Sequence, residues 1–349
     1  MYERLKMDNR NPICCIATIY DHLCLNGYEL NDKLIYLACL KSFFLNGIEE
    51  IKGIPLFFIA PVENRVDLFF FEKLGFEIEN IDLNTELKNK GAQNIIAYFD
   101  YYTLLSKDER KKKYNICPIH TTLIIEKDNE GWILNEIEFE GKERRFSSRT
   151  SEKLINANKM ELYPYPVDGV AYRILPNLST KEVEKRTISL IDENLKSIVK
   201  DVEEYRGTMW DGKYNVFYGL QAYDELIRFF KFLQQEYTNK VSVIQNRRYG
   251  IMLMTFRRFL LPLSGKGDFF RSEMAEAFEY YAKYKKNRRY DMVSKKLLDS
   301  AIEWRKLGNI IINISMKKDK LSELVNIIEI IEKIKKIELE AIYELKEAI

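Results

Sequence analysis

The 349-residue chain is long enough for two domains, and 46% hydrophobic with 31% charged residues is the balance of an ordinary globular protein. Its formal net charge of +2 gives no basic excess for binding nucleic acid, and no uncharged apolar run reaches the roughly 20 residues that cross a bilayer. The polar N-terminus lacks a signal-peptide core. Five cysteines occur, at positions 14, 15, 24, 39 and 117. Because their number is odd and they form no C-x-x-C pair, we expect a cytoplasmic protein without a disulfide framework.

The first element is a helix that opens with Asn11-Pro12-Ile13-Cys14-Cys15 and ends at Asn26-Gly27. Asn11 is predicted as the N-cap and Pro12 as the first helical residue, where its missing N–H costs nothing. Cys14 then lies in the first turn, where unpaired N–H groups and the helix dipole favour a thiolate. The alternative is that these cysteines are packing residues of the core, since cysteine is among the most buried residue types.

The remainder of the first half is predicted to be helices followed by antiparallel strands. Apolar spacing and glycine stops indicate helices over 30–45, 64–74 and 84–90. Residues 54–60 are expected to form a loop or a short strand. Further strands are predicted over 76–78, 94–100, 120–126 and 132–137, the last two joined by a turn at 127–131. This order is typical of an α+β fold.

The second half is predicted to be almost entirely helical. Residues 162–178 carry three prolines and little helical period, so they are interpreted as a linker. Ser179 and Glu182 then form a capping box, and helices fit 217–237, 241–263, 269–286, 291–315 and 321–349. The expected organisation is therefore a catalytic domain at 1–165 and an all-α domain at 166–349.

Only two histidines are present, so the base for a reactive thiol can be chosen by elimination. His22 lies on the same predicted helix as the cysteines, roughly 10 Å or more from either thiol at about 1.5 Å per residue. A base must come within hydrogen-bond reach, so His120 is the remaining choice. Asn135 lies on the next strand of the hairpin, where its carboxamide would receive the ring N–H of His120. The predicted set is a cysteine at the helix start, Cys14 or Cys15, with His120 and Asn135.

This chain order resembles papain-like enzymes, and several segments resemble one family of them. After Cys14 come a small residue at Ala17, apolar residues at Ile19 and Leu23, and Gly27 thirteen positions on. Other similar segments are 100–105 (DYYTLL), 120–125 (HTTLII), 132–135 (WILN), 219–222 (GLQA), 256–260 (FRRFL) and 301–305 (AIEWR). Together they resemble bacteriocin-processing cysteine peptidases and, more closely, butirosin-type acyltransferases, including amide-forming enzymes of the closthioamide type. The family resemblance selects Cys14 over Cys15, because counting from Cys15 would misplace Ala17, Ile19, Leu23 and Gly27.

Two departures from the resembled pattern affect the site. The family more often has aspartate where this chain has Asn135, and an amide does not offset the charge of an imidazolium. Papain-like peptidases carry an oxyanion-hole glutamine about six residues before the cysteine, where this chain has Asp8. Asn9, Asn11 or backbone N–H groups of the helix start would replace it. Asp100 is either a supporting site residue or the acceptor of a structural hydrogen bond.

The resemblance implies an acyltransferase of secondary-metabolite or antibiotic biosynthesis. Its implied partners are an acyl or peptidyl carrier protein as donor and a small amine or diamine as acceptor. No resident cofactor or metal is implied, because phosphopantetheine arrives on the carrier protein. A leader-peptide-trimming cysteine peptidase and an inactive papain-like binding scaffold are the alternatives. The acyl group, the amine and the oligomeric state stay open.

Overall fold

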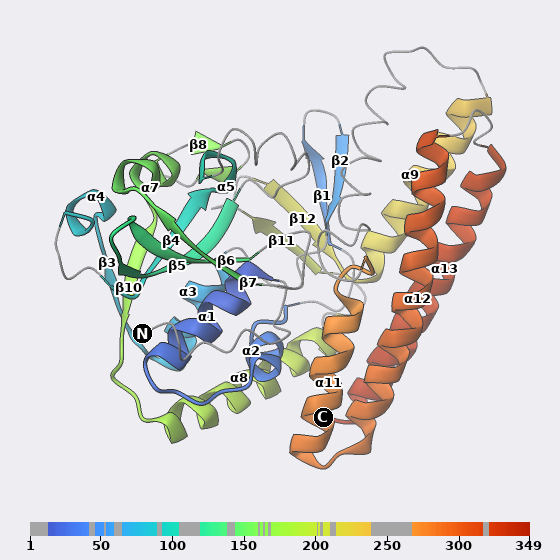
Figure 1. Cartoon of the computed structure of the whole chain (residues 1–349). Coiled ribbons are helices and arrows are strands. Elements are labelled where there is room, and N and C mark those ends of the chain that lie inside the picture. The colour runs from blue at the N-terminus through green and yellow to red at the C-terminus, as the bar shows by residue number, and fades with distance from the viewer. Residues whose placement is uncertain are drawn as a thin grey trace. The chain divides into compact units, whose positions relative to one another are not determined.

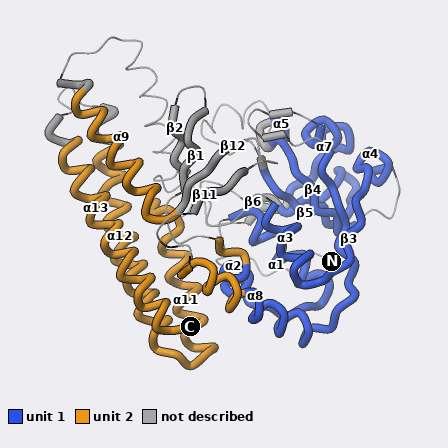
Figure 2. The backbone as a smooth tube through the Cα atoms, turned by 180° about the vertical axis from the view of Figure 1, so that it is seen from behind, with its two compact units in different colours: residues 1–38, 65–190 blue, residues 39–64, 191–349 orange. Residues whose placement is uncertain are grey.

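The computed structural model describes residues 13–41, 46–51, 54–58, 65–88, 93–104, 119–137, 144–159, 161–162, 165–166, 169–200, 202, 205–209, 214–238, 267–316 and 321–349. The chain forms two compact units (Figure 2). Unit 1 comprises residues 1–38 and 65–190, and unit 2 comprises residues 39–64 and 191–349. The units are not consecutive in sequence, which differs from the predicted single boundary at residue 165.

Unit 1 is built on a six-stranded sheet whose neighbouring strands are all antiparallel. Its order is β3-β10-β4-β5-β6-β7 (Figure 1). The strands are β3 (Glu77–Asn80), β4 (Ile95–Asp100), β5 (Ile119–Lys127), β6 (Trp132–Ile137), β7 (Arg144–Arg149) and β10 (Ala171–Leu175). A separate two-stranded ladder pairs β8 (Glu161–Leu162) with β9 (Tyr165–Pro166). Every described residue of β4 is buried, because helices cover both faces of the sheet.

One face of this sheet packs on α4 (Leu83–Glu86), α5 (Tyr101–Leu104) and α7 (Ser151–Asn158) (Figure 1). Apolar side chains of these helices and of four strands form one core cluster, which contains Leu83, Leu87, Ile95, Ala97, Phe99, Leu104, Ile124, Trp132, Leu134, Leu154, Ala157 and Ala171. The opposite face carries α1 (Cys14–Leu25) and α3 (Val66–Leu74), and α2 (Asp32–Ala38) follows α1 in the chain. The chain is therefore a mixed α+β protein.

The predicted β5–β6 hairpin is confirmed, together with the turn that closes it. Asp128 accepts the backbone N–H groups of Glu130 and Gly131, both at 2.8 Å, and donates its own N–H to the carbonyl of Gly131. A Cβ on Gly131 would lie 2.5 Å from the carbonyl oxygen of Arg149 in β7. Glycine is therefore required where the turn approaches the neighbouring strand.

Several predicted helix ends are also confirmed. Gly27 and Gly75 adopt left-handed backbone angles directly after α1 and α3, with φ of 81° and 78°. The capping box before α8 (Thr180–Lys200) forms as predicted: Glu182 accepts the N–H of Ser179 at 2.9 Å. These ends are local features, so side-chain chemistry a few residues away determines them.

The predicted linker at 162–178 is wrong for its central part, because residues 171–175 are strand β10. Ala171 pairs with Ala97 of β4, and Leu175 pairs with Glu77 of β3, so β10 lies between the two strands. Prolines flank this short strand on both sides. Because proline cannot donate a hydrogen bond to a β-ladder, the sequence pattern indicated a linker instead of a strand.

Unit 2 is not all-α, which corrects the second part of the predicted fold. It contains a four-stranded sheet of order β11-β12-β1-β2. Its strands are β1 (Asn46–Ile51), β2 (Ile54–Phe58), β11 (Tyr205–Met209) and β12 (Tyr214–Tyr218). Gly47 of β1 pairs with Phe217 of β12, so a segment expected in the first domain belongs to the second unit. The pairing joins residues about 170 positions apart, which local sequence patterns do not encode.

The described residues of unit 2 also include the end of α8 and four further long helices. These four are α9 (Leu220–Thr238), α11 (Arg271–Lys285), α12 (Arg288–Met316) and α13 (Leu321–Lys346), close to four of the predicted ranges. The helix predicted over 241–263 lies outside the described residues. Glu338 and Arg271 form a fully buried ion pair, with Nε and Nη2 of the arginine 2.6 and 2.9 Å from the carboxylate. Tyr223, Ser300 and Trp304 also donate to Glu338, so polar contacts join α9, α11, α12 and α13.

Candidate active site

Cys14 is the first residue of α1, so its predicted place in the first helical turn is confirmed. The predicted cap is not: Ile13 is the N-cap, it has extended backbone angles and no side chain caps the helix. Asn11 and Pro12 lie outside the described residues. No described side chain caps the start of α1, where the backbone N–H groups of the first turn have no acceptor within the helix.

The half-buried Cys14 thiol lies in surroundings that favour its ionised form. Its pKa is well below the usual value, chiefly because of a hydrogen bond with the side chain of Cys15. The charge of the nearby His120 and a hydrogen bond with the backbone of Thr121 lower the pKa further, and burial opposes them. The structure thus brings together the predicted thiol and the predicted base, which are 106 positions apart.

Helix α1 contacts the β5–β6 hairpin through polar side chains on one face. The hydroxyl of Thr18 donates to the carbonyl of Thr121 at 3.2 Å. One turn further, the carboxylate of Asp21 accepts a hydrogen bond from the amide Nδ2 of Asn135 in β6. Asp21 and Asn135 are 0% and 1% exposed, so this polar pair is enclosed.

The predicted hydrogen bond from the His120 ring to Asn135 is not formed. The amide of Asn135 donates to Asp21, and its Oδ1 has no hydrogen-bond partner among the described residues. The register gives a physical reason: Ile124 pairs with Leu134, so Asn135 falls level with Leu123, roughly 10 Å along the strand from His120. Asn135 therefore belongs to the contact between α1 and β6.

The supporting residues proposed from the sequence have different outcomes. Asp100 ends β4 and accepts a hydrogen bond from the hydroxyl of Thr103 in α5, which fits the structural alternative. Asn9 and Asn11 lie outside the described residues, as does Cys117. The described part of the chain therefore offers the N-terminal amides of α1, rather than an asparagine side chain, as oxyanion donors near Cys14.

A buried carboxyl group beside the thiols, that of Asp67, was not predicted from the sequence. Asp67 of α3 is 0% exposed and accepts the hydroxyls of Tyr98 in β4 and Tyr172 in β10. Burial raises the pKa of Asp67, the two tyrosine hydrogen bonds lower it, and the charge of Cys14 adds a small increase. Tyr98 also pairs with Thr121 of β5, which lies beside Cys14. The sequence carries a signal for it, since Asp67 interrupts the otherwise apolar residues 66–71 of α3.

His22, which the elimination predicted to be structural, is buried on α1. Its ring stacks edge-on against Phe71 of α3, with centroids 5.2 Å apart. Burial lowers its pKa to about 4. The amide of Asn26 donates to Nε2 at 3.2 Å and to the backbone carbonyl of His22 at 2.8 Å, so a neutral ring with its proton on Nδ1 fits this environment.

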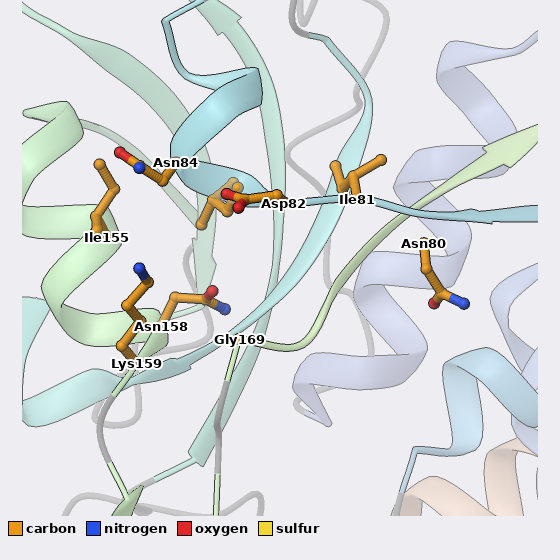
Figure 3. A pocket seen from close by; sticks show the side chains of 9 residues that line it. Asn80, Ile81, Asp82, Asn84, Ile155, Asn158, Lys159 and Gly169 are labelled. Carbon is orange, nitrogen blue, oxygen red and sulfur yellow. The ribbon is translucent and has the colours of Figure 1, made fainter.

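A pocket of about 300 Å³ opens elsewhere on unit 1 (Figure 3). It is lined by Asn80, Ile81, Asp82, Leu83, Asn84, Ile155, Asn158, Lys159 and Gly169. None of these is a predicted catalytic or supporting residue. Asn158 is oriented by two backbone carbonyls, those of Tyr98 and Val170, so its amide group serves the packing of α7 on the sheet.

The described residues contain neither a candidate metal site nor a candidate membrane-spanning helix. Within those ranges, no three histidine, cysteine or acidic side chains are grouped closely enough to bind a metal ion. The described helices also include none whose length and apolar character would let it cross a membrane.

A scan of the chain against protein-family models matched none of them. A search among curated proteins found no significant match. Cys14, His120 and their neighbours are the residues whose chemistry indicates a function.

Proposed function

We propose that this chain is a cysteine-dependent acyltransferase that takes an acyl group from a carrier-protein thioester and passes it to an amine. The observation that carries the proposal is the half-buried Cys14 thiol at the N-terminus of α1, its pKa lowered through contacts with Cys15, His120 and Thr121. A thiolate of this kind, next to an imidazole, is the usual equipment of a cysteine nucleophile.

The helix-and-sheet arrangement of unit 1 supports the papain-like part of the proposal. The nucleophile starts a helix, and the base lies on an antiparallel strand against which that helix packs. None of the four described cysteines is in a disulfide, which fits the proposed cytoplasmic location. The long helices of unit 2 are proposed to belong to a second domain that contacts the substrate or the carrier protein.

In the first proposed step, the sulfur of Cys14 attacks the thioester carbonyl. A new carbon–sulfur bond forms, the bond to the phosphopantetheine sulfur breaks, and His120 in its protonated form supplies the proton to the departing thiolate. One thioester replaces another, so the free-energy change of this step is close to zero. Backbone N–H groups at the start of α1 are the proposed donors to the oxyanion.

In the second step, the amine nitrogen attacks the acyl-enzyme. His120 accepts the proton from that nitrogen, the bond to the Cys14 sulfur breaks, and an amide leaves with the thiolate restored. The amide is more stable than the thioester, so the transfer runs forward. Water is the competing nucleophile, and the enzyme must exclude it during the lifetime of the intermediate.

The test uses octanoyl-N-acetylcysteamine as a carrier mimic and a short aliphatic diamine as acceptor. Intact-protein mass spectrometry should show one octanoyl group on the wild type and none on Cys14→Ala. Adding the diamine should release octanoyl amide. Release as octanoic acid only, or cleavage of peptides instead, would favour a hydrolase or the peptidase alternative. Folded protein with an alkylatable Cys14 and no adduct would contradict the transferase and favour a binding scaffold.

A further inference from the structure

Three residues on one face of α1 link the reactive thiol to the β5–β6 hairpin. Cys14, Thr18 and Asp21 are spaced i, i+4 and i+7, which places them along one side of the helix. Cys14 interacts with His120 at the start of β5, Thr18 donates to a β5 carbonyl, and Asp21 accepts from Asn135 of β6. The last contact lies about 10 Å along the helix axis from the thiol.

We propose that Asp21 is a positioning residue whose hydrogen bond with Asn135 fixes the rotation of α1 on the hairpin and so holds the Cys14 sulfur against His120. The proposal rests on the proposed function only in taking Cys14 as the reactive thiol. It gives Asn135 a role in docking the helix, instead of the predicted role in orienting the imidazole.

Two points of attachment are needed to fix a helix on a sheet. The Thr18–Thr121 contact, at 3.2 Å, is one polar point of attachment and does not by itself set the rotation of α1. The Asp21–Asn135 contact is on a second strand, and its enclosure prevents water from replacing either partner. A displacement of about 1 Å at a reacting group costs on the order of 10² in rate, so the rotation of α1 matters for the thiol.

The pairing also explains why an amide at position 135 suits this chain. A buried carboxylate at Asp21 needs a donor opposite it, and the Nδ2 group of Asn135 supplies one. Aspartate at 135 would place two buried carboxylates face to face, which share a site only if one takes up a proton. The departure from the aspartate of the resembled family is therefore matched by an acid contributed from α1.

The experiment compares the wild type with Asp21→Ala, Asp21→Asn, Asn135→Asp and the exchange variant Asp21→Asn/Asn135→Asp. The readout is the rate at which iodoacetamide alkylates Cys14, resolved from Cys15 by peptide mass spectrometry, across the pH range in which thiols titrate. The ionisable neighbours of the thiol are the same in every variant: Cys15, His120, Asp67, Tyr98 and Tyr172. Urea unfolding of each variant reports stability separately.

Asp21→Ala and Asn135→Asp should slow alkylation at neutral pH by roughly tenfold, because each removes the donor–acceptor pair. Asp21→Asn keeps an acceptor oxygen, and the exchange variant restores an amide opposite a carboxylate. Both should therefore alkylate within roughly threefold of the wild type. Should the two disruptive variants fail to fold, the exchange variant still decides: a folded protein with an altered Cys14 profile overturns the proposal.

Asn158→Asp is the matched control, since Asn158 is a buried amide of the same unit that donates to backbone carbonyls of the sheet and makes no hydrogen bond with α1. It should lose stability without moving the Cys14 profile. Wild-type alkylation in Asn135→Asp would overturn the proposal, and stability loss alone in Asp21→Ala would reduce Asp21 to a structural residue. Alkylation needs no acyl donor, so these outcomes stand whether or not carrier thioesters react.

Discussion

Asp21 of α1 and Asn135 of β6, 114 positions apart, share a hydrogen bond in the interior of unit 1. The amide of Asn135 was predicted to orient the imidazole of His120. It instead donates to the carboxylate of Asp21. The bond also ties the helix that begins with Cys14 to the strand next to His120. The helix that carries Cys14 and the hairpin that carries His120 are therefore joined through Asp21 and Asn135.

Cys14 is expected to be the nucleophile, with Cys15 in a supporting role. Cys14→Ala should abolish acyl loading. Cys15→Ala removes the largest cause of the lowered pKa of Cys14, so the pKa rises, the thiolate fraction at neutral pH falls, and loading slows without ceasing. Intact-protein mass spectrometry with the thioester mimic measures both. Full loading in Cys14→Ala together with none in Cys15→Ala would reverse the assignment.

His120→Ala should lower turnover by roughly 10²–10⁴, the range expected when an acid–base group is lost. The same variant should raise the pKa of the Cys14 thiol, because the charge of His120 lowers it. Steady-state amide formation and the pH dependence of alkylation are the two measurements. The control is His22→Gln, which alters the other histidine; unchanged turnover in folded His120→Ala would refute the mechanism.

Protonation of His22 is expected to contribute to acid unfolding. Its folded pKa is about 4, below the ordinary value of about 6.5, so the unfolded state binds the proton first as pH falls. Stability is unaffected by this group above about pH 6.5, and it decreases between there and pH 4 by up to about 3 kcal/mol. In urea unfolding at neutral and acid pH, His22→Gln should lose less stability than the wild type over this window. An equal loss in both proteins would assign the acid sensitivity to other groups.

Glu338→Gln should destabilise unit 2 strongly. It leaves the buried guanidinium of Arg271 without its counter-charge, a loss of about 3–5 kcal/mol. Glu340→Gln is the matched control on the same helix, since its pair with Lys296 is about 40% exposed and is worth less than about 1 kcal/mol. Urea unfolding followed by tryptophan fluorescence compares the two. Similar losses would mean that the Glu338 network contributes no more than a surface ion pair.

The sequence by itself determined the elements whose causes are local. The glycine stops after α1 and α3, the Ser179–Glu182 capping box and the Asp128 turn follow from interactions between residues a few positions apart. It also placed Cys14 in a first helical turn and selected His120 over His22, because helix rise fixes distances along one element. These predictions needed no knowledge of the remainder of the chain.

Only the tertiary structure decided which distant segments meet. It assigned 46–58 to the sheet of unit 2, made 171–175 a strand between β3 and β4, and brought Asp67 beside the thiols. It also paired Asn135 with Asp21 instead of His120, because burial makes each polar group take whichever complementary partner packing places opposite it. Strand register and helix rotation decide that choice, and neither is written in local spacing.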